Sequence, residues 1–262
     1  MVRSAAALLL VLLSALPWSS LRAADTRYLT DTAWARDPVD QRLLYREQHG
    51  LRLAPDGRLL ERRVLYRCAD GTAFARKRVD YRADAEAPAF ALDDARSGYR
   101  EGLRLREGRR EVFVQNPGET ERSAWLDDAP LVADAGFDQW TRARWDQLSA
   151  GERLRLRFLV PSRLSAYTFS VQALPTRPDS GEQRFRLRLS GWLGWLAPHI
   201  DVSYATRDRR LLRFEGLSNL RDDRGERPLL VRIDFPEPAQ PASAADFAAL
   251  DAEPLRACRV SG

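Results

Sequence analysis

The chain has 262 residues, of which 44% are hydrophobic and 30% are charged, so it can bury a sizeable core and is not compositionally disordered. Its formal net charge is only +5, with 42 basic and 37 acidic residues, which argues against a nucleic-acid partner. The basic residues are arginines except for Lys77, a bias that is typical of a GC-rich genome, although arginine also suits an anionic partner.

The first 23 residues have the three parts of a cleavable export signal. Arg3 supplies the positive end, residues 5–16 form an apolar run, and Leu21-Arg22-Ala23 fits a signal peptidase site. The run is shorter than the roughly 20 residues that cross a bilayer core. We therefore expect residues 24–262 to be exported to a bacterial periplasm as one β-rich domain with a C-terminal tail, without a transmembrane segment after signal removal.

Alternation of apolar and polar residues dominates the rest of the chain. Successive side chains of a strand point to opposite faces, so this period of two predicts an antiparallel sheet with one buried face. Turn sequences such as Asp56-Gly57, Asp70-Gly71 and Asn116-Pro117-Gly118 separate the strands. The expected strands cover residues 45–49, 59–68, 73–81, 98–105, 111–115, 120–126, 153–160, 167–173, 184–189, 200–205, 211–215 and 229–235.

Helix signals are few. Residues 135–148 form the best candidate, with Asp134 as N-cap, and residues 244–250 form a shorter one after a proline-rich link. The apolar stripe of the first helix would consist of Phe137, Trp140, Trp145 and Leu148. The sequence thus predicts a mainly β fold, a large twisted antiparallel sheet or half-barrel of roughly ten to twelve strands wrapping one or two helices.

The two cysteines, Cys68 and Cys258, lie far apart in the chain. In an oxidising compartment we expect them to form a disulfide that pins the C-terminal tail to an early strand. No C-x-x-C motif occurs, so a redox role is not expected.

Both histidines have an acidic residue two positions away, in the pairs Glu47/His49 and His199/Asp201. If the two strands met, these side chains could bind zinc or assist a hydrolysis. Nothing in the sequence brings the strands together, and the preferred interpretation is that each histidine is a hydrogen-bonded core residue or faces solvent.

Asp134 and Asp138 are one helical turn apart and could act as the acid and base of a glycosidase. We favour the alternative that they stabilise the start of the helix through its dipole. No nucleophile elbow, phosphate loop, dinucleotide fingerprint or zinc-protease motif occurs. We therefore predict no catalytic residue, no metal site and no cofactor.

Residues 191–198 form the most apolar stretch after the export signal. Trp192 and Trp195 could line the mouth of an apolar pocket, whereas the structural alternative is a buried turn that plugs one end of the sheet. The arginines of residues 153–157 and 184–188 could form a basic outer face for lipid phosphates if their strands are neighbours, or be ordinary solvated side chains.

Export and a long series of amphipathic strands around a helix resemble the periplasmic lipoprotein carriers of the LolA/LolB type. The segment Phe214-Glu215-Gly216-Leu217-Ser218-Asn219-Leu220-Arg221-Asp222, followed by Val231-Arg232-Ile233, is similar to the closing strands of such domains. The resemblance covers most of residues 24–262 and rests on strand pattern. It implies a concave sheet around an apolar cavity that holds acyl chains.

We therefore expect a non-catalytic carrier or binder of a lipid or another hydrophobic or amphiphilic ligand. Its apolar cavity would be lined by Phe158, Phe169, Leu187 and Tyr204 and gated by Trp192 and Trp195. One alternative is a structural or interaction protein of the cell envelope with a protein partner. The less favoured alternative is a hydrolase that uses Glu47, His49, His199 and Asp201.

Overall fold

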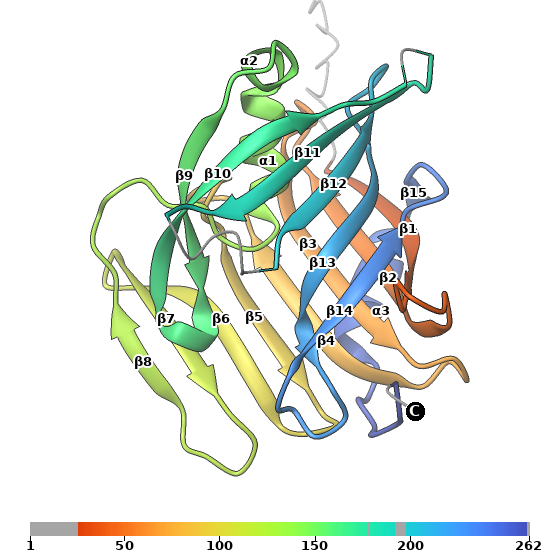
Figure 1. Cartoon of the computed structure of the whole chain (residues 1–262). Coiled ribbons are helices and arrows are strands. Elements are labelled where there is room, and N and C mark those ends of the chain that lie inside the picture. Colours follow the sequence, from red (N-terminus) through yellow and green to blue (C-terminus); the bar gives the residue numbers. More distant parts are fainter. Residues whose placement is uncertain (1–25, 178, 192–197, 261–262) are drawn as a thin grey trace, which may run out of the picture.

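The computed structural model describes residues 26–177, 179–191 and 198–260. The segment predicted to be an export signal, Trp192 and Trp195 lie outside the described residues. The described part of the chain forms one continuous antiparallel sheet of 15 strands, shown in Figure 1. The mainly β prediction is confirmed, and the sheet has more strands than the expected ten to twelve.

The first half of the sheet is a meander in which each strand pairs with its neighbours in the chain. Its strands are β1 (Arg27–Arg36), β2 (Leu43–Leu53), β3 (Leu59–Arg67), β4 (Ala73–Asp80), β5 (Ala89–Asp94), β6 (Tyr99–Arg106), β7 (Arg109–Gln115) and β8 (Arg122–Trp125). The expected Asp-Gly turns join β2 to β3 and β3 to β4, and Gly57 and Gly71 there have φ of 87° and 93°. Glycine adopts such positive φ without steric cost, so these turns set the register of the meander.

The second half of the sheet is another meander, and it joins the first half through β1. Its strands are β9 (Leu154–Val160), β10 (Ser165–Leu174), β11 (Glu182–Leu189), β12 (Ile200–Ala205), β13 (Leu211–Arg221) and β14 (Pro228–Asp234). The end of β1, from Trp34 to Arg36, pairs with β14, whereas its start pairs with the short β15 (Gln240–Ala242). The outermost strands, β8 and β9, do not pair with each other, so the sheet is an open half-barrel.

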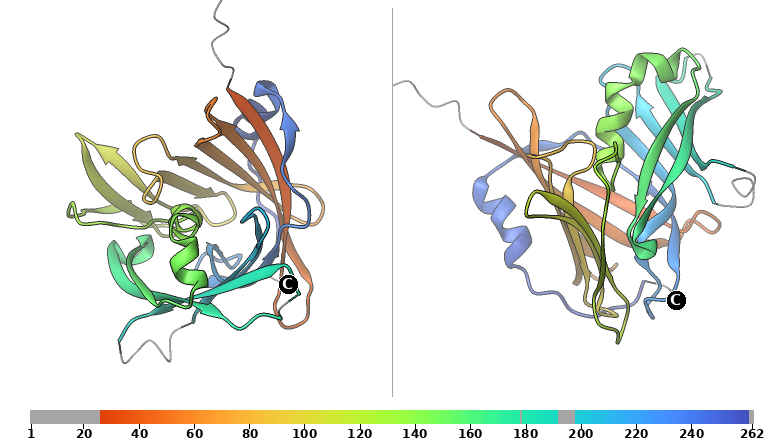
Figure 2. Two further views of the ribbon diagram at one scale, coloured as in Figure 1. Left: turned by 90° about the horizontal axis from the view of Figure 1, so that it is seen from above. Right: turned by 90° about the vertical axis from the view of Figure 1, so that its left-hand side faces the viewer.

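Two short helices, α1 (Gly136–Ala143) and α2 (Trp145–Ser149), lie between the halves of the curled sheet (Figure 2). A single helix over residues 135–148 was expected, but the chain leaves helical geometry at Arg144, whose guanidinium binds the carboxylate of Glu86. The expected N-cap is also wrong. Asp134 has a left-handed φ of 45° and its carboxylate binds Lys77, so Ala135 caps α1 without a side-chain hydrogen bond.

The helices cover the concave face of β9–β12. The predicted stripe of Phe137, Trp140, Trp145 and Leu148 packs there against strand residues such as Phe185. Leu148 is fully buried, and the ring of Trp145 meets that of Phe185 edge to face at 5.4 Å between centroids. Edge-to-face aromatic pairs stabilise a core beyond simple area burial. This cluster fixes the helices in one end of the half-barrel.

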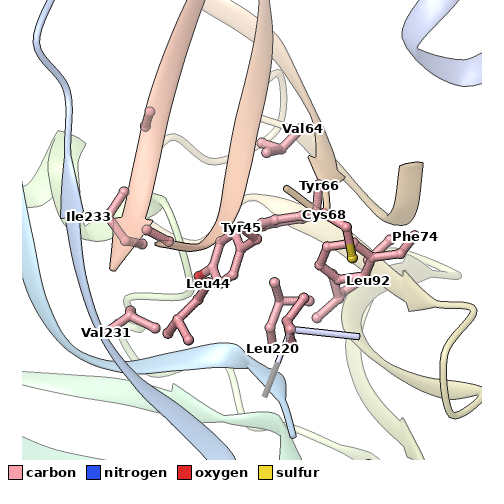
Figure 3. Close-up of a cluster of buried hydrophobic side chains, with 14 of the residues drawn as sticks. Leu44, Tyr45, Val64, Tyr66, Cys68, Phe74, Leu92, Leu220, Val231 and Ile233 are labelled. Carbon is pink, nitrogen blue, oxygen red and sulfur yellow. The ribbon is translucent and has the colours of Figure 1, made fainter. Parts of the chain in front are cut away.

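A second core cluster joins the two halves of the sheet. Figure 3 shows Tyr45, Tyr66 and Phe74 from β2–β4 packed with Leu220 of β13 and Val231 of β14. Leu220 and Phe74 are fully buried. Because β13 and the early strands are far apart in the sequence, this cluster holds the half-barrel in its curled shape.

The third helix, α3 (Ala244–Ala252), packs on the outer face of β2 and β3 (Figure 2). Its position confirms the helix predicted at residues 244–250. Gly50 of β2 permits this approach, since a Cβ there would lie 2.6 Å from the side chain of Leu250. The chain then returns to the end of β3, where Cys258 forms the predicted disulfide with Cys68. The C-terminal tail is therefore covalently tied to the first half of the sheet.

Candidate functional site

A cavity of about 480 Å³ lies between the two halves of the sheet and α1. This volume falls within the range of roughly 300–1,000 Å³ that is typical of small-molecule sites in proteins. The half-barrel is therefore not filled solid by its inward-facing side chains, although several of them are aromatic.

One wall of the cavity is apolar and comes from the second half of the sheet. Phe158, Phe169, Leu187 and Tyr204 all line the cavity, so the structure brings together the four described side chains that were expected to face a ligand. The rings of Phe158 and Phe169 lie 5.8 Å apart between centroids in an edge-to-face arrangement. Trp192 and Trp195, the expected gate, lie outside the described residues.

The opposite wall, from the first half of the sheet, is the more polar one, although Val64, Tyr66 and Phe90 also line it, and the strand register builds it. A single inward-facing row crosses β1 to β6, because each of its residues is the cross-strand partner of the next: Asp31, His49, Val64, Lys77, Leu92 and Glu101. Directly paired residues on one face of a sheet are close neighbours. Three of its polar side chains, those of His49, Lys77 and Glu101, line one side of the cavity, and Asp31 continues the row beyond it.

His49 and Glu47 form a hydrogen-bonded pair within this polar wall. The Nε2 atom of His49 lies 2.9 Å from Oε2 of Glu47, and both residues are buried. The other ring nitrogen, Nδ1, is buried without a hydrogen-bond partner, and the ring packs against Phe235. A histidine held in this way by a carboxylate has a defined ring orientation. Within the described residues no hydroxyl or thiol binds the imidazole, so a nucleophilic arrangement is not formed.

Lys77, the single lysine of the chain, forms a buried ion pair with Asp134. The distance from Nζ to Oδ1 is 2.8 Å, and the side chains are 12% and 2% exposed. Burial lowers the pKa of Lys77, but the neighbouring Asp134 carboxylate more than compensates and leaves it raised. The pair ties the segment that precedes α1 to the polar wall of the sheet.

Glu101 lies at the far end of the polar row and is almost completely buried. Its carboxylate accepts hydrogen bonds from the hydroxyl of Tyr99 at 2.5 Å and from the side-chain amide of Asn219. Burial raises the pKa of Glu101, and these two hydrogen bonds only partly counteract the effect. Arg221 in turn donates to the Tyr99 hydroxyl and covers its ring. This network connects β6 to β13 across the half-barrel.

Of the second expected pair, His199 lines the same cavity as Glu47 and His49, whereas Asp201 does not line it. Asp201 is a cross-strand partner of Arg186 on the outer face of β12, and the two form a bidentate ion pair at 2.6 and 2.7 Å. The hypothesis of a four-residue catalytic or zinc cluster is therefore wrong. Across the described ranges no group of three or more metal-ligating side chains is assembled.

The expected basic outer face is also absent, because β10 separates β9 from β11. Ser170 of β10 lies between Arg155 and Arg188. Arg157 binds Asp127, and Arg186 binds Asp201, so much of the positive charge is already compensated. We assign no anion-binding role to this surface.

None of the helices in the described part of the chain is long and apolar enough to cross a membrane. No protein-family model and no curated protein matches the chain. The chain is similar to a crystal structure of a β-barrel-like protein of domain of unknown function DUF1849 from Brucella abortus. The two are 11% identical with a TM-score of 0.37, and the match covers 81% of this chain and 98% of that chain. At this level of similarity the match is a coarse architectural likeness without functional content.

Proposed function

We propose that the protein is an exported, non-catalytic carrier that binds one amphiphilic ligand between the two halves of its half-barrel. The cavity carries this proposal, because an apolar wall of aromatic and aliphatic side chains faces a wall of buried polar ones. A purely apolar ligand would leave the polar wall without partners, and a purely polar one would leave the aromatic wall exposed to water.

Two features favour action outside the cytoplasm. The first 23 residues fit a cleavable export signal, and the disulfide between Cys68 and Cys258 is a feature of proteins in oxidising compartments. We place the protein in a bacterial periplasm on these grounds, in a role similar to that of the LolA/LolB-type carriers.

The test is uptake of a fluorescent apolar probe, 1-N-phenylnaphthylamine, by the purified protein. We expect saturable binding of one probe per chain, displaced by a medium-chain amphiphile. Phe169→Ala removes one ring from the apolar wall and is expected to weaken probe binding by roughly 5- to 30-fold, the effect of losing one buried aromatic contact of about 1–2 kcal/mol.

Trp125→Ala is the matched control, because this aromatic residue on β8 is 45% exposed and does not line the cavity. It should leave the affinity unchanged. Absence of saturable uptake, or equal affinities for the wild type and Phe169→Ala, would contradict the proposal.

A further inference from the structure

Three side chains that line the cavity each carry a buried polar atom without a hydrogen-bond partner. These atoms are Nε of Arg62, Nδ1 of His49 and Oδ2 of Asp134. A native structure seldom leaves such atoms unsatisfied, because each costs roughly 1–3 kcal/mol when buried alone. Three of them along one cavity indicate that a polar group occupies this position when the cavity is filled.

The register and the ion pair place these residues close together. Arg62 and Val64 lie on the inward face of β3, and Val64 is the cross-strand partner of both His49 and Lys77. Asp134 reaches the same region through its ion pair with Lys77. The three unpartnered atoms therefore lie around a common stretch of the polar wall, opposite the aromatic wall of the second half of the sheet.

The charge of this region shows which polar group fits. The cavity lining contains four acidic residues, Glu47, Glu101, Asp134 and Asp138, and four basic residues, Arg62, Lys77, Arg163 and Arg221. The lining is thus formally balanced and requires no net charge from a ligand.

The surroundings of Arg62 agree with this balance. Burial lowers the pKa of its guanidinium, but nearby Tyr81, Asp138 and other carboxylates outweigh that effect and raise it. These carboxylates compensate the positive charge of Arg62 and would repel an anionic head group. Within the described residues, the Nε atom of this guanidinium has no hydrogen-bond partner.

The unpartnered atoms also define the hydrogen bonds that a ligand must supply. The N–H of Arg62 requires an acceptor, the carboxylate oxygen of Asp134 requires a donor, and Nδ1 of His49 can use either, depending on the tautomer. We propose that Arg62, His49 and Asp134 form a head-group site for an amphiphile whose polar end has no net charge and carries both a hydrogen-bond donor and an acceptor. This inference rests on the proposed function and specifies the ligand class.

Binding of five amphiphilic or apolar compounds with the same twelve-carbon chain tests the inference. Isothermal titration of the purified protein would compare monolaurin, dodecylphosphocholine, laurate, dodecyltrimethylammonium and dodecane. We expect the tightest binding for monolaurin, a neutral donor and acceptor, at least tenfold tighter than for laurate, dodecyltrimethylammonium or dodecane. A preference for dodecylphosphocholine, which lacks a donor, or for either charged compound would overturn the inference, as would equal affinities for monolaurin and dodecane.

Arg62→Met provides a second, independent readout. It removes the donor but keeps a long apolar side chain, and it is expected to weaken monolaurin binding roughly tenfold while dodecane binding stays unchanged. Arg63→Met is the matched control, because Arg63 lies on the opposite face of the same strand and binds Glu61 and Asp251. Equal ratios of monolaurin to dodecane affinity in Arg62→Met and wild type would contradict the head-group site.

The two proposals fail in different ways. If none of the five compounds binds, the carrier function itself is wrong. If the compounds bind without the expected order, the cavity binds apolar chains but the head-group site does not exist. Should Arg62→Met not fold, the order of affinities in the wild type alone still decides the inference.

Discussion

Loss of the ammonium group of Lys77 is expected to be the most damaging single change in the polar wall. In Lys77→Met the carboxylate of Asp134, which is 2% exposed, would stay buried and lose the one counterion that binds it within the described residues. Breaking one partner of a buried ion pair typically costs about 3–5 kcal/mol, since the remaining charge is uncompensated. We therefore expect Lys77→Met to lower the free energy of unfolding by about 3–5 kcal/mol.

Urea unfolding followed by tryptophan fluorescence measures this effect. Arg78→Met is the control, because the side chain of Arg78, which follows Lys77 on the same strand, is 46% exposed, and such surface ion pairs contribute only about 0–1 kcal/mol. In the double variant Lys77→Met/Asp134→Asn the buried charge is gone, so most of the lost stability should return. The reasoning is refuted if Lys77→Met is no more destabilising than Arg78→Met, or if the double variant is less stable than Lys77→Met.

Three further predictions concern the polar network, the tail and the helix core. Burial raises the pKa of Glu101 in the folded protein above its ordinary value of 4.5. The stability that protonated Glu101 contributes is therefore fully present below pH 4.5 and is lost as the pH rises through the pKa of the folded state. Glu101→Gln should thus be more stable than wild type at pH 7, with the difference shrinking towards pH 4, and a constant difference in urea titrations would exclude this coupling. Replacing Cys68 and Cys258 by serine should lower the free energy of unfolding by at most about 5 kcal/mol, the chain-entropy value for a crosslink spanning 190 residues. A variant with the same melting temperature as the oxidised wild type would contradict this prediction. Leu148→Ala should cost about 2–5 kcal/mol because Leu148 is fully buried beneath the sheet, whereas Leu230→Ala, at a half-exposed position, should change stability by less than about 1 kcal/mol.

Most strands could be predicted from the sequence, because buried apolar residues alternate with solvent-facing polar ones along each of them. The strand at Arg27–Arg36 was missed for a physical reason. Its inward face carries Asp31, Ala33 and Ala35, which are small or polar and show no apolar alternation. The same feature hid the polar wall, since inward polar residues such as His49 and Lys77 interrupt the expected pattern.

Contacts between distant strands were beyond the reach of sequence pattern. Nothing local indicates that Val64 lies between His49 and Lys77, or that β10 separates the two arginine-rich strands. The left-handed backbone of Asp134, which turns its carboxylate from the helix towards Lys77, likewise depends on a partner 57 residues away. The apolar residues of the cavity were found because they follow the buried face of their strands.

Native mass spectrometry of the protein purified from the periplasm of cells that express the full chain tests the central claim most directly. An organic extract of the same sample identifies any bound compound. The account predicts one amphiphilic molecule per chain, with a protein mass that lacks the export signal and contains the Cys68–Cys258 disulfide. A ligand-free protein that takes up no amphiphile when one is added, or a protein that retains its first 23 residues in the cytoplasm, would contradict it.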